Sequence, residues 1–158
     1  MIPSVLIANR GEIAVRLIRT YRALGVRTVA VYSDADAGAL HVRLADQALP
    51  IGLPPVSDSY LNSAALIAAA VESGAGAVDP GYGLLSENPG FARDVRAAGL
   101  IFIGPPADAI AAMGDKPAAH AIARRAGVPV VPGSGVITSA NQAESAAARL
   151  GYPVVVKA

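Results

Sequence analysis

Two lysines are the residues of this chain best suited to binding a phosphate. The sequence contains 13 basic residues, of which only Lys116 and Lys157 are lysines. Lys116 lies at the expected start of a helix, where a positive charge opposes the helix dipole and does not stabilise the helix. Lys157 follows the apolar run 154–156, so its ammonium must reach water or meet an anion. Both positions suit neutralisation of phosphate charge, and the alternative is that both are ordinary surface lysines.

The loop over residues 79–88, DPGYGLLSEN, is a second candidate site. Two glycines bracket Tyr82, so the backbone can turn tightly and approach a ligand closely. An aromatic ring held between glycines can also support a planar ring, which favours a ligand site. Glu87 and Asn88 follow, but a helix expected to begin there explains them equally well as capping residues.

Arginines recur every three residues on one expected helix face, at Arg16, Arg19 and Arg22. Such a face is either solvated or part of a salt-bridged contact between subunits, and the pattern leaves both interpretations open. The two histidines, His41 and His120, have no carboxylate or imidazole partner at metal-ligand spacing, so neither is assigned a role. We therefore expect no metal site within this sequence.

The composition excludes several classes of protein. The chain has 158 residues, of which 53% are apolar and 16% charged, and its net charge is +1. So much apolar and so little charged content excludes disorder, and near-zero net charge argues against nucleic-acid binding through a basic patch. Apolar runs fall short of the roughly 18 residues that a membrane span needs. Cysteine is absent, and no signal peptide precedes the first strand-like segment, so we expect a cytoplasmic protein.

Strands and helices are expected to alternate along the first part of the chain. Strands are expected at residues 5–8, 28–32, 47–51, 76–79 and 100–103. Helices are expected at residues 13–24, 39–45, 59–72, with Ser59 as a possible N-cap, and 88–98. Strands separated by helices pair in parallel through right-handed crossovers, so the first ~105 residues are expected to form an open, doubly wound α/β sheet. An antiparallel α+β sheet is the alternative.

The pattern changes after Gly104. Helices are expected at residues 107–113, 116–126 and 139–150, and a new strand over residues 151–158. We therefore expect two domains, residues 1–110 and residues 111–158. In the first, ligands are expected at the carboxyl ends of the strands, although no loop there is a G-x-G-x-x-G or P-loop motif.

Several strings in fixed order carry a family resemblance. They are IANRGEIAVRLIR, TVAVYSDAD, ALHVRLAD, SYLN, PGYGLLSEN, FIGP, MGDK, AGVPVVPG and GYPVVVKA. Together they resemble biotin carboxylase, in the form found in acyl-CoA carboxylase α-chains, although pyruvate and urea carboxylases share much of this region. The resemblance implies a Rossmann-like N-terminal domain followed by the incomplete start of an ATP-grasp domain.

The resemblance also implies an ATP-dependent ligase. In that family ATP and bicarbonate, with Mg²⁺ or Mn²⁺, give carboxyphosphate, which carboxylates biotin on its carrier protein as the first half-reaction of the carboxylase. By resemblance Lys116 and Lys157 contact ATP phosphates, Tyr82 and Gly83 lie on the biotin side, and Glu87 lies nearby. Arg16 and Arg19 match a region used for dimerisation. A homodimer, a biotin carrier protein or domain and a carboxyltransferase subunit are the expected partners, with no nucleic acid or membrane.

Two positions depart from the family pattern. Asp79 replaces a usual His, which would put a carboxylate near the pocket, and Leu84 replaces a usual Phe. The metal ligands and catalytic residues of the family lie beyond residue 158, so we expect these residues alone to be inactive and to contain no catalytic residue. The acyl acceptor is not encoded here. Another ATP-grasp ligase and a non-catalytic α/β dimerisation module remain the alternatives.

Overall fold

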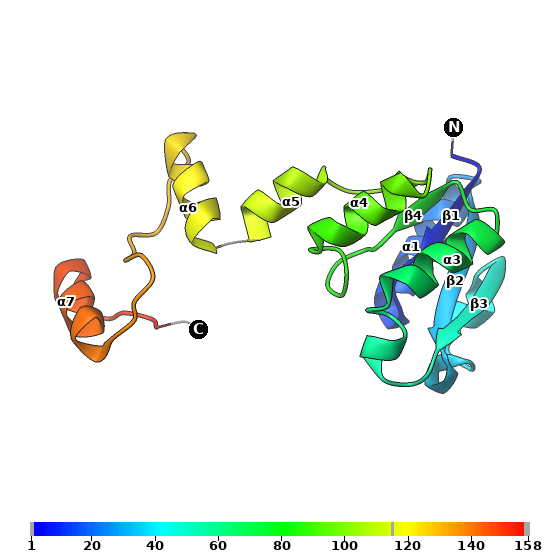
Figure 1. The fold of residues 1–158 in the computed structure, drawn as a ribbon, viewed down its shortest axis with the longest axis horizontal. Coiled ribbons are helices and arrows are strands. Elements are labelled where there is room, and N and C mark those ends of the chain that lie inside the picture. The colour runs from blue at the N-terminus through cyan, green and yellow to red at the C-terminus, as the bar shows by residue number, and fades with distance from the viewer. Residues whose placement is uncertain (1, 115, 157–158) are drawn as a thin grey trace. The chain divides into compact units, whose positions relative to one another are not determined.

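The computed structural model describes residues 2–114 and 116–156. The chain divides into two compact units, Met1–Ala111 and Ala112–Ala158. Figure 1 shows the strands gathered in the first unit, while the second contains helices joined by extended segments. Within the described residues, no helix combines the length and the apolar character needed to span a bilayer.

A five-stranded parallel sheet forms the centre of the first unit. The strands are β1 (Ser4–Ile7), β2 (Arg27–Ser33), β3 (Gln47–Gly52), β4 (Ala77–Asp79) and β5 (Ile101–Phe102). Their order across the sheet is β3-β2-β1-β4-β5, and each neighbouring pair is parallel. This confirms the expected doubly wound α/β sheet. The chain moves outward from β1 in one direction and then crosses to the other side, so a topological switch point lies between β1 and β4.

Helices cover both faces of this sheet (Figure 1). They are α1 (Gly11–Ala23), α2 (Leu40–Leu44), α3 (Ser63–Glu72) and α4 (Pro89–Ala97). Successive strand residues point to opposite faces, so Leu6 and Ile7 of β1 enter different cores. Leu6 belongs to the larger core, which is completed by α3 and α4, whereas Ile7 packs with buried residues of α1. Both faces of β1 are thus buried, as its continuous apolar sequence predicts.

The two edges of the sheet differ from its centre. The edge strand β3 contains Pro50, which has no backbone N–H to donate. The other edge strand, β5, is only two residues long and pairs with β4. The central strand β1, by contrast, pairs along its whole length with β2 and also pairs with β4.

The start of α3 corrects one sequence-based expectation. The helix begins at Ser63, and Asn62 is its N-cap because the Asn62 side chain accepts a hydrogen bond from the Ala65 N–H at 3.1 Å. Ser59, the expected cap, is buried and donates its hydroxyl to the Pro55 carbonyl at 2.9 Å. Its side chain therefore closes the preceding turn and is not available to the helix.

The second unit contains α6 (Lys116–Arg125) and α7 (Ala140–Leu150), while α5 (Ala107–Gly114) crosses the division between the units. The helix expected at residues 139–150 is α7, and Ser139 is its N-cap because the Ser139 hydroxyl accepts a hydrogen bond from the Gln142 N–H at 3.3 Å. The strand expected over residues 151–158 is not formed in residues 151–156, where Val155 is 81% exposed. A strand needs a hydrogen-bonded neighbour, and the described part of this unit contains no strand.

Candidate functional site

The carboxyl ends of β1 and β4 are joined by the side chain of Asn9. This residue is buried directly after β1, and its Nδ2 donates to the Pro80 carbonyl at 2.7 Å and to the Tyr82 carbonyl at 2.9 Å. One amide group therefore holds the main chain of the loop that follows β4. The contact lies at the topological switch point, where open α/β sheets bind their ligands.

Tyr82 projects from this loop toward solvent. Its side chain is 59% exposed, and its hydroxyl donates to Oε1 of Glu12 at 2.6 Å. The hydrogen bond to the carboxylate raises the pKa of the Tyr82 phenol, because it stabilises the protonated form. Gly81 and Gly83 on either side have φ values of +63° and +68°, the left-handed region that glycine tolerates. The sequence-predicted loop is therefore a tight turn that presents an aromatic ring.

Asp79 is a buried part of the turn. Its side chain is 7% exposed, its Oδ1 accepts from the Gly81 N–H at 2.8 Å, and its Oδ2 accepts from the Tyr21 hydroxyl at 2.5 Å. Burial first, and then this hydrogen bond, raise the pKa of Tyr21 well above its ordinary value. The carboxylate of Asp79, which replaces the usual His, thus already accepts two hydrogen bonds within the protein and stabilises the turn.

A second polar network lies beside the switch point, after β1 and β2. The Arg10 guanidinium lies 3.5 Å from Oδ2 of Asp36 and 5.4 Å from the centre of the Tyr60 ring. The buried Tyr60 hydroxyl donates to the same Asp36 oxygen at 2.7 Å. That hydrogen bond lowers the pKa of Asp36, while burial raises the pKa of Tyr60 to about 12. Sequence reasoning missed this network, although Asp36 follows a predicted strand and so belongs to the same sheet edge.

Glu87 and the predicted arginines of α1 are exposed, whereas Leu84 is partly buried. Glu87 makes no hydrogen bond or ion pair with any residue that the structure describes. Arg16 and Arg19 lie on the solvent side of α1, whereas Arg22 donates to the Leu44 carbonyl at 2.5 Å. Leu84 has a φ of +48° and packs against the larger core. The structure therefore brings Tyr82 and Gly83 together with Glu12, and leaves Glu87 outside that group.

The predicted phosphate-binding lysines belong to the second unit. Lys116 is the first residue of α6, as the sequence predicts, and Lys157 lies outside the described residues. Among the described residues, no cluster of three or more His, Asp or Glu side chains could hold a metal ion.

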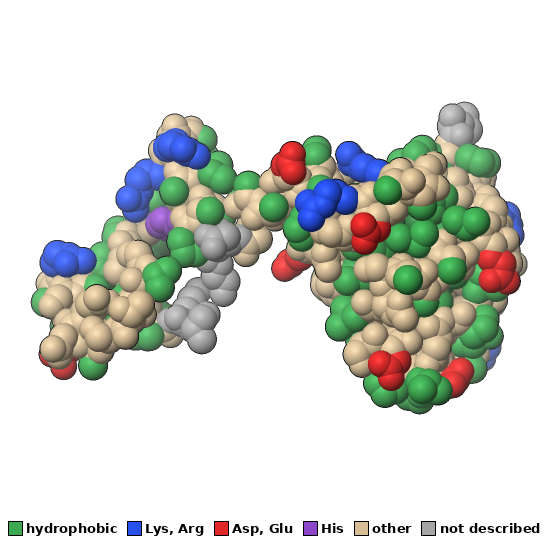
Figure 2. Space-filling model, viewed as in Figure 1, with side chains coloured by type: hydrophobic (Ala, Val, Ile, Leu, Met, Phe, Trp, Pro, Cys, Tyr) green, Lys and Arg blue, Asp and Glu red, His purple; other side chains and the backbone are tan. Residues whose placement is uncertain are grey.

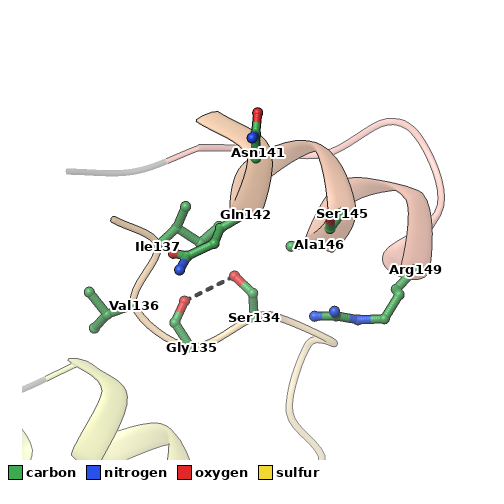
Figure 3. A pocket seen from close by; sticks show the side chains of 9 residues that line it. All are labelled: Ser134, Gly135, Val136, Ile137, Asn141, Gln142, Ser145, Ala146 and Arg149. Carbon is green, nitrogen blue, oxygen red and sulfur yellow. Dashed lines mark hydrogen bonds between the residues drawn. The ribbon is translucent and has the colours of Figure 1, made fainter. Parts of the chain in front are cut away.

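The second unit has a hollow of about 380 Å³ between the segment before α7 and the helix itself (Figure 3). Its lining residues are Ser134, Gly135, Val136, Ile137, Asn141, Gln142, Ser145, Ala146 and Arg149. The only charged side chain among them is Arg149, and none of the predicted site residues takes part.

On the face drawn in Figure 2, charged side chains are scattered among apolar and neutral ones.

Comparison with known proteins identifies the family. Residues 1–110 match the model described as "Biotin carboxylase, N-terminal domain", and residues 115–158 match "Carbamoyl-phosphate synthase L chain, ATP binding domain". The methylcrotonoyl-CoA carboxylase subunit alpha of Oryza sativa is 54% identical over 99% of this chain and 21% of its own length. Biotin carboxylase 1 of Bacillus subtilis is 52% identical over the whole chain and 35% of its own length.

Solved structures give the same assignment. The biotin carboxylase β-γ-ATP complex from Campylobacter jejuni matches with a TM-score of 0.89 and 47% identity, over 97% of this chain and 34% of that one. The biotin carboxylase domain dimer of the Hydrogenobacter thermophilus 2-oxoglutarate carboxylase, in complex with MgADP, ADP and bicarbonate, matches with a TM-score of 0.88 and 47% identity, over the same shares. This chain thus spans only 21% and 35% of the lengths of the two curated relatives named above. With its first 110 residues matched in full, the chain belongs to the biotin carboxylase N-terminal domain family.

Proposed function

We propose that this chain is the N-terminal part of a biotin carboxylase. The whole protein would use ATP and bicarbonate to carboxylate biotin on a carrier protein, as the first half-reaction of an acyl-CoA carboxylase. The observation that carries this proposal is that the two family matches follow one another along the chain, over residues 1–110 and 115–158. The proposed domains, residues 1–110 and 111–158, follow the same succession, as does the compact first unit Met1–Ala111.

The proposed biotin side is the turn that carries Tyr82 and Gly83. The ring of Tyr82 is exposed, and no residue other than the two chain neighbours of Gly83 has an atom within 4 Å of the position that a Cβ on Gly83 would occupy. This open space beside an exposed aromatic face suits a planar ureido ring. Biotin, when bound, supplies the nitrogen that accepts the carboxyl group, while Tyr82 seats its ring. Glu87 is assigned only to the surroundings of this site.

The proposed phosphate contacts are Lys116 and Lys157. Their ammonium groups would offset the charge that accumulates on the ATP phosphates, with Mg²⁺ or Mn²⁺ held by residues beyond position 158. The position of Lys116 supports this role, because a positive charge at the start of α6 opposes the helix dipole and does not stabilise the helix. We propose no catalytic residue within residues 1–158.

Dimerisation is proposed to use the face of α1 that carries Arg16 and Arg19. Both side chains are exposed, and neither pairs with a described residue of its own chain. Further proposed partners are a biotin carrier protein or domain and a carboxyltransferase subunit, and the proposed location is cytoplasmic. The acyl acceptor would be chosen by the transferase.

The test of this function uses the full-length protein with Lys116→Ala or Lys157→Ala. Because a hydrogen bond to a charged group is lost, each variant should raise the KM for ATP by about tenfold or more in a biotin- and bicarbonate-dependent assay of ATP hydrolysis. Arg93→Ala, which removes an exposed charge from α4, is the matched control. An unchanged KM in both lysine variants would remove their assignment.

Biotin dependence separates the alternatives in the same assay. Another ATP-grasp ligase would hydrolyse ATP with its own substrate and would not respond to biotin. A non-catalytic dimerisation module would show no turnover under any of these conditions.

A further inference from the structure

The first turn of α1 contacts the turn that carries Tyr82 through one side-chain hydrogen bond. The Tyr82 hydroxyl lies 2.6 Å from Oε1 of Glu12, and these residues are 70 positions apart in the sequence. Both side chains are exposed, so neither is held by packing on all sides. The orientation of the Tyr82 ring therefore depends on polar contacts more than that of a core aromatic residue does.

The main chain beneath Tyr82 is already fixed by other groups. Asn9 binds the Pro80 and Tyr82 carbonyls, and Asp79 binds the Gly81 N–H. The turn also lies directly on α1, because a Cβ on Gly81 would come within 2.8 Å of Ile13 Cγ2. With the backbone held, the side-chain torsions of Tyr82 are the freedom that remains.

Glu12 is well placed to remove that freedom. It lies in the first turn of α1, and its Oε1 accepts the hydrogen bond from the Tyr82 hydroxyl. Within the described residues, Glu12 has no other side-chain partner, and no second group bonds to the Tyr82 hydroxyl. Arg16, one turn further along α1, makes no ion pair with Glu12 in the described part of the chain. The carboxylate is thus dedicated to the phenol.

We infer that Glu12 is a positioning residue for Tyr82, holding the ring in the orientation that receives biotin. This inference rests on the proposed function of the turn. Without the carboxylate, the Tyr82 side chain populates other rotamers, and each binding event must then select the competent one. The loss should therefore fall on the KM for biotin more than on kcat.

The experiment uses the full-length enzyme with free biotin as the substrate. Glu12→Ala should raise the KM for biotin about tenfold, the value of one hydrogen bond, and should lower kcat much less. Glu12→Gln keeps an acceptor at the same reach and should recover most of the loss. Glu72→Ala, which removes an exposed carboxylate at the end of α3, is the matched control and should leave both constants unchanged.

A double-mutant cycle tests whether Glu12 acts through Tyr82. Tyr82→Phe deletes the hydroxyl and retains the ring, so Glu12→Ala combined with Tyr82→Phe should be no worse than Tyr82→Phe alone. An unchanged KM in Glu12→Ala, or losses that add in the double variant, would overturn the inference. Tyr82→Ala tests the proposed function separately. If Tyr82→Ala leaves the KM for biotin unchanged, the turn is not the biotin side. If Tyr82→Ala raises this KM and Glu12→Ala leaves it unchanged, only the positioning role of Glu12 is excluded.

Discussion

Among the described residues, His41 has the one buried side-chain nitrogen or oxygen that lacks a hydrogen-bond partner. The residue is 1% exposed, and its Nε2 lies 3.2 Å from the Val31 carbonyl oxygen. A carbonyl only accepts, so Nε2 carries the proton and the unpartnered Nδ1 carries a lone pair. Burial lowers the pKa of His41, because a charged imidazolium would lose its hydration there. The sequence analysis assigns His41 no role, whereas its burial in the structure links this residue to the stability of the fold.

This burial predicts a pH dependence of folding. Below the ordinary pKa of 6.5 the unfolded chain binds a proton at His41 that the folded chain resists. The free energy of unfolding should therefore fall as the pH drops below about 6.5. His41→Gln, which keeps a donor for the Val31 carbonyl but does not titrate, should flatten that slope. Urea unfolding between about pH 8 and about pH 5 measures it.

The chain's other histidine provides the control. His120→Gln changes the partly exposed histidine of α6 and should leave the slope as it is in the parent protein. A slope that persists in His41→Gln would show that the titrating group lies elsewhere. The charge of Asp36 raises the pKa of His41, whereas the charge of Arg10 lowers it. Removing both charges together should therefore change the slope little.

The residues of the candidate site differ in how far the sequence alone predicts their contacts. Tyr82 and Gly83 could be found because neighbouring glycines mark a turn within one short string. Glu12, Asn9 and Tyr60 could not, since each acts on a residue 24 to 73 positions away. Only the strand order shows that these loops share one edge. Spacing along the chain carries no information on such pairs.

The turn after β4 and the helix α1 form one packed element pair. A Cβ on Gly81 would lie 2.8 Å from Ile13 Cγ2 and 3.1 Å from Asn9 Nδ2. Gly83, two residues on, has nearly the same φ but nothing within 4 Å. Both glycines adopt the left-handed backbone conformation that the turn requires, but only at Gly81 would a side chain also collide with α1.

Alanine at these two positions separates strain from packing. Gly83→Ala should cost about 1 kcal/mol of unfolding free energy, for a left-handed residue with a Cβ. Gly81→Ala should cost about 1–3 kcal/mol more, since the methyl group meets α1. Urea unfolding of the two variants gives the difference directly. Equal losses would mean that the turn moves away from α1 at little cost.

At the level of whole elements, the sequence predicted the positions of all five strands of the sheet but misplaced the start of one helix. Continuous apolar runs identify buried parallel strands, and all five expected strands of the sheet are present. The start of α3 was placed four residues too early, because Ser59 and Asn62 are both capable caps. Only the fold shows that the Ser59 hydroxyl is already used by Pro55. The strand expected after α7 fails for a similar reason, since pairing cannot be read from one segment.

For the whole molecule, the proposed dimer makes a prediction about mass in solution. Arg16→Glu combined with Arg19→Glu should convert a full-length dimer to a monomer, because like charges or unpaired charges would then face the partner. Arg93→Glu combined with Arg96→Glu, with the same spacing on α4, is the matched control and should remain dimeric. Sedimentation of both variants and of the parent measures the result. A parent protein that is already monomeric would remove the interface on α1.

The edges of the sheet have a consequence for self-association of the folded domain. A strand added to β3 would find no donor at Pro50, and one added beside β5 would find a ladder two residues long. Neither edge therefore presents a long unbroken row of backbone groups, and this disfavours edge-to-edge pairing between copies of the first unit. Contacts between copies are thereby directed to side-chain surfaces such as helices, where shape and charge decide which partner is accepted.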